Sequence, residues 1–346
     1  MRRLFALILM VLLLPISVHA SDFTAPEAPE EAQEYMPDQT QSFSEGVWYV
    51  IKKGLEKTQP VITDTAATCL TLLCIIILCS ILQVFSGESK RVVNLAGTVL
   101  IGVILFGSTD GLINLGRQTV INMSDYGNLL LPVMTGALAA QGGIGASTAL
   151  YAGTAFFSAV LNKAITTFVI PLLYVYAAVA VCCCAISQPL IEELKKFLKW
   201  LITWMLKIVL YIFIGYMGIT GVVSGTADTA AVKATKLTIS GIVPVVGGII
   251  SDASETILVS AGLVKNTIGI YGLLVYLSLL IGPFLQIGIP YLLFKMTGSV
   301  CMMFGVKEPS KLISEFSTVM GMILGMTGTI ALLLMISTVC FMKGLS

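Results

Sequence analysis

Few residues of this chain have a type and spacing that could support chemistry. The single histidine, His19, lies in an N-terminal segment that we expect to be removed, which excludes histidine catalysis and histidine metal ligation in the mature chain. Eight cysteines are present, and none has the C-x-x-C spacing of a redox or zinc motif. Most lie in long apolar runs, where a cysteine behaves as a small apolar residue.

Two other interpretations of the cysteines stay open. The run Cys182–Cys184 lies near one end of its apolar stretch, where palmitoylation is an alternative. A disulfide between Cys69 and Cys340 is a second alternative, although the spacing does not favour it. The sequence has no phosphate loop, nucleophile elbow, metal box or paired-carboxylate site. We therefore predict that the chain is not an enzyme and that it binds no cofactor and no metal.

Three polar residues inside apolar stretches are candidate intramembrane polar groups. Lys207 is the clearest, because an ionisable residue within a membrane span is a functional candidate. We favour the plainer interpretation that its side chain extends to the lipid headgroups beside Trp200 and Trp204. Gln83 and Gln286 are more typical of hydrogen bonds between helices than of a substrate site.

The composition indicates that these residues are held by membrane helices. Apolar residue types make up 56% of the 346 residues and charged types 11%, against about 25% charged residues in soluble domains. Such a surface needs lipid as its solvent. The net charge of +1 gives no basic face for nucleic acid.

Six apolar stretches are long enough to span a bilayer, which takes about 20 residues. Because backbone in lipid must satisfy its own hydrogen bonds, we expect helices. The predicted fold class is an all-α, polytopic helical membrane protein with spans at 66–85, 92–109, 164–187, 201–223, 268–294 and 318–342.

The N-terminus has the features of a secretory signal peptide, residues 1–20. Arg2 and Arg3 precede an apolar run that is too short to span a bilayer, and small residues favour cleavage between Ala20 and Ser21. An uncleaved anchor is the alternative. Residues 21–45 are acidic and predict a disordered outer tail. Residues 46–60 have apolar residues at helical spacing with lysines between them, which predicts an amphipathic helix on the membrane surface.

The charges of the short loops predict the orientation. With the signal cleaved, the loops 86–91, 188–200 and 295–317 lie inside, and they are rich in lysine. The positive-inside rule favours this arrangement, which leaves the C-terminus outside.

Two apolar, glycine-rich segments, 129–153 and 242–262, are predicted to be re-entrant or interfacial elements on the outer side. Surface loops, or two further spans that would give eight crossings, are the alternatives. Glycine permits the sharp turns that a re-entrant hairpin needs. The candidate pore or gate residues are Gly142, Gly143, Gly145, Gly247 and Gly248.

The two glycine-rich segments also indicate a parallel internal repeat. Pro132-Val133 in the first parallels Pro244-Val245 in the second, and each segment is followed by two predicted spans. The repeats are then 111–225 and 226–346, and the first helix pair is 61–110.

From residue 21 onward the chain closely resembles stage III sporulation protein AE of endospore-forming bacteria. The stretch PVVGGIISDASETILVSAGLVKN, residues 244–266, is the most specific part of the resemblance. The resemblance implies a multi-pass protein of the mother-cell membrane that surrounds the forespore. It also implies work with other stage III sporulation A proteins and a forespore membrane partner, in a channel complex needed for endospore development. It carries over no catalytic residue.

Three functions follow as hypotheses. The first is a subunit that forms or gates the passage of that transenvelope complex. The second is a stand-alone small-molecule permease, and the third is a non-conducting scaffold for assembly. Membrane lipid is an expected partner, nucleic acid is not, and a homo-oligomer stays open.

Overall fold

The chain folds almost entirely as long helices. The computed structural model describes residues 24–37, 43–85, 89–186, 188–242 and 247–343. For 220–242 and 247–265 it describes the backbone only. Two short helices come first, followed by six helical rods with no strand in the described part. The elements are α2 (Glu30–Gln33), α3 (Phe43–Glu56), α4 (Gln59–Phe85), α5 (Lys90–Ala140), α6 (Ile144–Ala164), η3 (Ile165–Val169), α7 (Ile170–Ile186), α8 (Pro189–Ile242), α9 (Gly247–Met302) and α10 (Lys307–Lys343).

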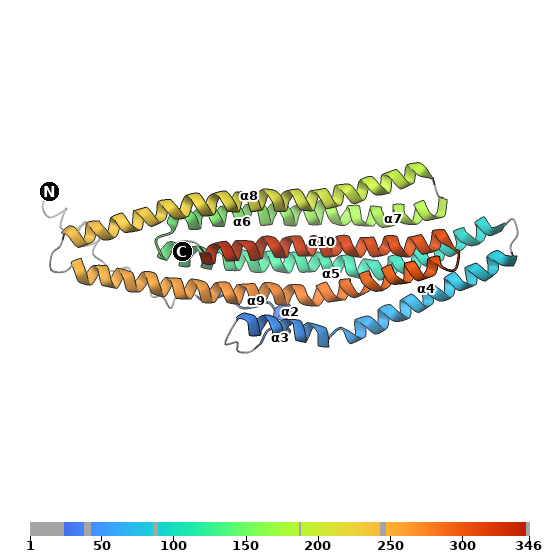
Figure 1. Cartoon of the computed structure of the whole chain (residues 1–346), viewed down its shortest axis with the longest axis horizontal. Coiled ribbons are helices and arrows are strands. Elements are labelled where there is room, and N and C mark those ends of the chain that lie inside the picture. The colour runs from blue at the N-terminus through green and yellow to red at the C-terminus, as the bar shows by residue number, and fades with distance from the viewer. Residues whose placement is uncertain (1–23, 38–42, 86–88, 187, 243–246, 344–346) are drawn as a thin grey trace.

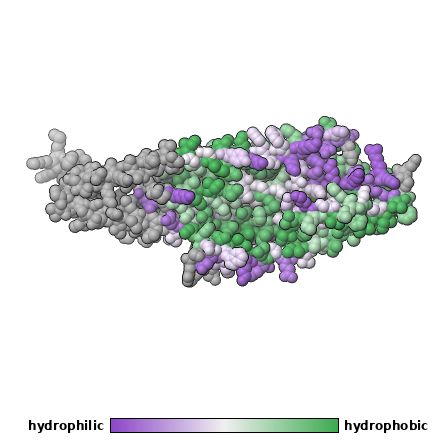
Figure 2. Space-filling model, viewed as in Figure 1, coloured by the Kyte–Doolittle hydropathy of each residue, from purple (hydrophilic) through white to green (hydrophobic). Residues whose placement is uncertain are grey.

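The six rods are long and apolar enough to cross a membrane, which confirms the predicted class and the count of six. On the face shown in Figure 2, hydrophobic residues cover much of the described surface. They lie side by side along one axis and alternate in direction (Figure 1). The α4–α5, α7–α8 and α9–α10 connections lie at one end of the bundle. We call this the lysine end, because Lys90, Lys195, Lys307 and Lys311 belong to the helix ends that meet there.

The rods are much longer than the predicted spans. At 1.5 Å per residue, the 51 residues of α5 extend about 76 Å and the 56 residues of α9 about 84 Å. A hydrocarbon core of about 30 Å takes up about 39 Å of helix even at a tilt of 40°. The predicted span 92–109 is therefore only part of one continuous helix, and a large part of the bundle extends beyond the hydrocarbon core.

Helix α10 lies in the centre of the bundle and packs against α5, α6, α7, α8 and α9. Two glycines of α5 permit its close approach. A Cβ at Gly127 would lie 2.9 Å from Leu334 Cδ2, and a Cβ at Gly116 would overlap Ile323. Small residues at helix contacts are typical of membrane bundles, because packing rather than water exclusion drives association in lipid.

Pro171 is accommodated by a local change of helix type. Proline lacks an N–H, and its ring clashes with the carbonyl one turn earlier. The turn before it, Ile165–Val169, is a π-helix between α6 and α7. The wider turn lets the α6–α7 rod continue, and it lies about midway along it.

The glycine-rich segments are corners between long helices. Residues 129–140 continue α5, residues 141–143 turn, and α6 begins at Ile144. Residues 129–153 are thus the ends of two long helices and the turn that joins them, and their position as a re-entrant or interfacial element stays a prediction. In the second segment α8 ends at Ile242 and α9 begins at Gly247.

Part of the predicted disordered tail is also ordered. Residues 30–33 form α2, and both Ala32 and Tyr35 are buried. The Tyr35 ring lies over Gly282 of α9, and Lys57 forms an ion pair with Glu34. Burial raises the pKa of the Tyr35 phenol; Glu34 raises it further and Lys57 opposes the shift. The disorder prediction is wrong for these residues, because two apolar side chains in an acidic segment suffice to dock it.

The predicted surface helix is α3, and it packs along α9 (Figure 1). Its buried residues Gly46, Val50 and Gly54 recur every four positions, which makes one face of the helix. Trp48 on the other side is 70% exposed. The contact is close, because a Cβ at Gly54 would lie 2.8 Å from Ile281 Cγ1.

Other predictions are not decided by the fold. The signal peptide and its cleavage site at Ala20 and Ser21 lie outside the described residues. The internal repeat stays a prediction, and Pro244 falls on 243–246, also outside them. Cys69 and Cys340 are free thiols, so the alternative of a disulfide between them is wrong.

Candidate functional site

A cavity with both charged and apolar lining residues lies between α8, α9 and α10, toward the lysine end. Its volume is about 570 Å³. Each helix contributes one face of side chains at helical spacing. The lining residues are Lys199, Ile202, Thr203, Leu206 and Lys207 of α8, Tyr291, Lys295 and Ser299 of α9, and Ser314, Ser317, Thr318, Gly321, Met322, Gly325 and Thr329 of α10.

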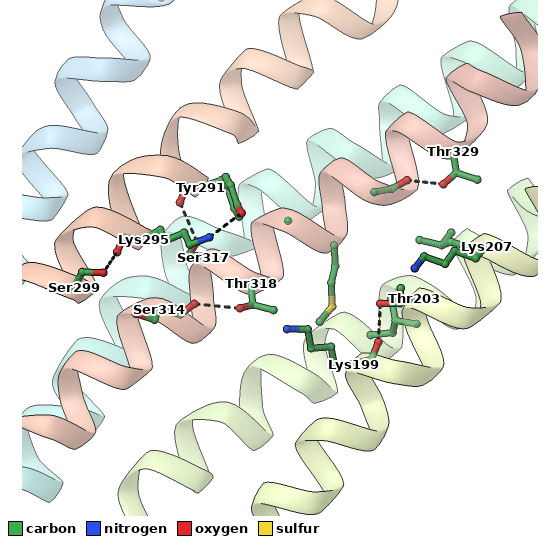
Figure 3. A pocket seen from close by; sticks show the side chains of 15 residues that line it. Lys199, Thr203, Lys207, Tyr291, Lys295, Ser299, Ser314, Ser317, Thr318 and Thr329 are labelled. Carbon is green, nitrogen blue, oxygen red and sulfur yellow. Dashed lines mark hydrogen bonds between the residues drawn. The ribbon is translucent and has the colours of Figure 1, made fainter. Parts of the chain in front are cut away.

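Three lysines give the cavity its charge. Lys199 and Lys207 are eight residues apart on α8, just over two helical turns, and so share a face. Lys295 faces them from α9, and its amine lies 5.6 Å from the centre of the Tyr291 ring. In Figure 3 the amines of Lys199 and Lys207 extend from α8 toward α10.

Hydroxyl groups form much of the remaining wall, and most donate to the backbone of their own helix. Thr203 donates to the carbonyl of Lys199 at 2.8 Å, and Ser299 donates to that of Lys295 at 3.0 Å (Figure 3). Ser317 instead joins two helices, because it donates to the carbonyl of Tyr291 at 2.9 Å. Gly321 and Gly325 have no side chain to project from α10 into the cavity, so space remains between α8 and α9.

No carboxylate lines the cavity among the described residues. The acidic side chains nearby have partners elsewhere. Glu193 pairs with Lys196 at 2.8 Å, Glu192 with Lys311 at 3.5 Å, and Glu308 accepts a hydrogen bond from Asn94. The positive charge of Lys199, Lys207 and Lys295 is therefore not neutralised by a described side chain of the cavity wall.

A buried ion pair lies close to the cavity. The Lys195 amine lies 2.5 Å from Glu315 Oε1, and Tyr176 donates to Glu315 Oε2 at 2.6 Å. The three residues come from α8, α10 and α7. Lys195 is only 5% exposed, so the pair is shielded from solvent. This cluster ties three helices together next to the cavity.

The structure separates the three polar residues that the sequence singled out. Lys207 lines the cavity. Gln83 donates to Asn94, which joins α4 to α5 near the lysine end. Gln286 lines a smaller cleft of about 230 Å³ between α4, α5 and α9, together with Asp64 and Ser108.

The candidate gate glycines are not part of the cavity. Gly142, with a φ of 94°, is in the left-handed region that glycine tolerates, and it makes the α5–α6 turn. Gly143 precedes α6, and Gly145 is in its first turn. Gly247 and Gly248 begin α9. These residues lie toward the end of the bundle opposite the lysine end (Figure 1).

Sequence reasoning placed Lys199 and Lys295 among the basic loops and missed their role in the cavity. The sequence signal that could have found them is the helical spacing of Lys199 and Lys207, together with the hydroxyl residues at helical spacing in 314–329. That signal is weak, because it does not tell which way each helix faces. Among the described residues, no group of three histidine, cysteine or acidic side chains is placed to hold a metal ion.

Comparison with known proteins gives one consistent result. A family model described as stage III sporulation protein AE matches residues 32–344. Stage III sporulation protein AE of Bacillus subtilis (strain 168) is 23% identical over 236 residues, which are 66% of this chain and 59% of that relative. The matched region thus covers less than two thirds of the relative's length. No solved structure matches the chain.

Proposed function

Because this chain belongs to the stage III sporulation protein AE family, we propose that it is a multi-pass subunit of a transenvelope complex between the mother cell and the forespore. Its partners are other stage III sporulation A proteins and, through them, a forespore membrane protein. Its place is the mother-cell membrane around the forespore. In this complex it contributes to the membrane passage, as a wall or a gate.

The observation that supports a passage role is the cavity between α8, α9 and α10. Beside it, α10 also has buried apolar side chains such as Phe316, Val319 and Ile323 that pack in the core. The cavity presents three lysines and several hydroxyls, and it extends along just over four helical turns of α10, from Ser314 to Thr329. Polar groups at membrane depth typically face a water-filled path or the bundle interior. The α8–α9 groove over α10 is thus the place where this chain lines a passage.

The bilayer fits best on the half of the bundle near the lysine end. Phe197, Trp200 and Trp204 are exposed on α8 and stack at 6.0 and 5.9 Å, as in the aromatic belts of membrane interfaces. The stack lies 8 to 15 residues after the start of α8, or about 12 to 22 Å along the axis, so a short part of the bundle at the lysine end extends beyond the hydrocarbon core.

Cysteine accessibility tests the passage. In a background with all eight cysteines replaced, single cysteines are placed at Ser299, Ser314 and Thr329, along the cavity. A charged, membrane-impermeant thiol reagent added at the lysine-end side should modify all three in the assembled complex. Val103, which is 68% exposed on the outside of α5, is the lipid-facing control and should react only with a permeant reagent.

The outcome separates a passage from a scaffold. If cysteines at Ser314 and Thr329 behave like the one at Val103, no water path reaches the cavity and the passage role fails. A non-conducting scaffold is the second candidate, and the length of the helices favours it. With the bilayer placed as above, roughly half of α5 and α9 extends beyond it, enough to dock other subunits. Truncating that part would then abolish co-purification with the other stage III A proteins.

A further inference from the structure

The lysine-lined cavity has the chemistry of an anion site. Lys199, Lys207 and Lys295 are three ammonium groups within one cavity, and its described wall holds no carboxylate. A charge at membrane depth is costly unless it is paired. A ligand with several anionic oxygens would pair with these lysines and also accept hydrogen bonds from the hydroxyls of the wall.

The depth of the cavity indicates where the anion comes from. Lys199 is the neighbour of Trp200 in the exposed aromatic stack of α8, which marks the level of the lipid headgroups. Lys295 lies seven residues from the end of α9, about 10 Å along the axis. A headgroup phosphate at this level is within the reach of long lysine side chains.

The remaining wall suits the acyl chains of such a ligand. Ile202, Leu206 and Met322 line the cavity beside the lysines. At Gly321 and Gly325 no side chain projects from α10 into the cavity, which leaves space for an acyl chain. A site with a cationic end and an apolar wall is amphipathic, as a phospholipid is. Basic pockets between membrane helices are a known mode of binding anionic headgroups.

We propose that this cavity binds a phosphate group, carried by an anionic phospholipid of the leaflet at the lysine end. Lys199 and Lys295 hold the phosphate at the headgroup level, and Lys207 holds a second anionic group or a deeper oxygen. The inference depends on membrane insertion alone, and it holds whether the chain conducts or only scaffolds. It also explains why three lysines can line one cavity whose described wall holds no acidic side chain.

The test is the thermal unfolding of the purified full chain in neutral detergent with added lipid. A ligand that binds the folded state raises the unfolding midpoint according to its concentration and Kd. Phosphatidylglycerol should raise it and phosphatidylcholine should not. The variant Lys199→Gln/Lys295→Gln should bind phosphatidylglycerol about tenfold or more weakly, because it loses two charge-assisted contacts.

Lys196→Gln is the matched control, because Lys196 is on the same helix, is exposed and already pairs with Glu193. It should keep the full response. An equal response of the double variant and Lys196→Gln would overturn the proposal. Inorganic phosphate is the third arm: if it stabilises as much as phosphatidylglycerol, the lipid source is wrong and the ligand is soluble.

The single variants Lys199→Gln and Lys207→Gln guard against a double variant that does not fold. Each should shift the phosphatidylglycerol titration to higher lipid concentration while its unfolding midpoint without lipid stays at or above the wild-type value. The reason is that removing one of three uncompensated charges relieves repulsion in the free cavity. A fall in that midpoint together with an unchanged titration would refute the assignment. Thiol accessibility does not enter this readout, so failure of the passage leaves the result intact.

Discussion

The ion pair between Lys195 and Glu315 should be one of the most sensitive points of the bundle to mutation. Glu315→Gln keeps the shape of the side chain and removes its charge. Lys195, 5% exposed, then keeps its ammonium with only a neutral amide 2.5 Å away, and the Tyr176 hydroxyl loses a charged acceptor. Breaking a buried pair in this way costs about 3–5 kcal/mol, a large part of the 5–15 kcal/mol that stabilises typical folds.

The assay is reversible unfolding in mixed micelles of neutral detergent and dodecyl sulfate, followed by helical ellipticity. Glu193→Gln is the control. Glu193 pairs with Lys196 on the same helix at a similar distance, 2.8 Å, but both side chains are exposed, so its loss should leave the transition almost unchanged. If Glu315→Gln and Glu193→Gln unfold at the same dodecyl sulfate fraction, burial does not decide the strength of these pairs and the reasoning is refuted.

An apolar replacement of the whole cluster gives the converse result. Changing Lys195→Met, Glu315→Leu and Tyr176→Phe together removes every charge and every unsatisfied group. Such replacements are often neutral or stabilising, so the triple variant should be within about 1 kcal/mol of the wild type or above it. A triple variant as unstable as Glu315→Gln would mean that packing, and not the unpaired charge, causes the loss.

Two further predictions concern α3 and the orientation of the bundle. Gly54→Leu should detach α3 from α9, because overpacking at this contact costs about 1–3 kcal/mol. The loss should be seen as faster proteolysis of α3, whereas the control Gly107→Leu, whose side chain meets open space, should change the rate little. Equal proteolysis of the two variants would show that α3 is not held by this contact. A cysteine at Gln188, at the lysine end, should react with an impermeant thiol reagent from the inside, and one at Gln141, at the opposite corner, from the outside; labelling of both from one side would contradict six crossings.

The sequence alone determined the class of the protein and located six stretches long enough to span a membrane. Apolar stretch length and the scarcity of charge are local properties, and a bilayer turns them directly into helices because lipid offers no partner for the backbone. The same local information identified α3, since its apolar residues repeat at helical spacing. The lysines near 90, 195 and 307 marked the end at which the connections meet.

Local sequence patterns did not predict the structure of segments that are stabilised by contacts with distant helices. The glycines at 142 and 143 did not reveal that the residues on either side of them belong to two long helices. The acidic residues before 37 predicted disorder, but Ala32 and Tyr35 dock on the bundle. In both cases the stabilising contacts are made with a helix far away in the sequence, so they cannot be predicted from the residues of the segment itself.

The candidate site was decided by the tertiary structure. Lys199, Lys207 and Lys295 line one cavity only because α8 and α9 pack on α10 with these faces turned toward it. Lys195 finds Glu315 across 120 positions of the chain. Hydropathy determines which segments cross the membrane. Within lipid, however, the hydrophobic effect does not select which face of a helix packs against its neighbour. That choice comes from side-chain packing, small residues and polar pairing, which exist only once the six helices are assembled.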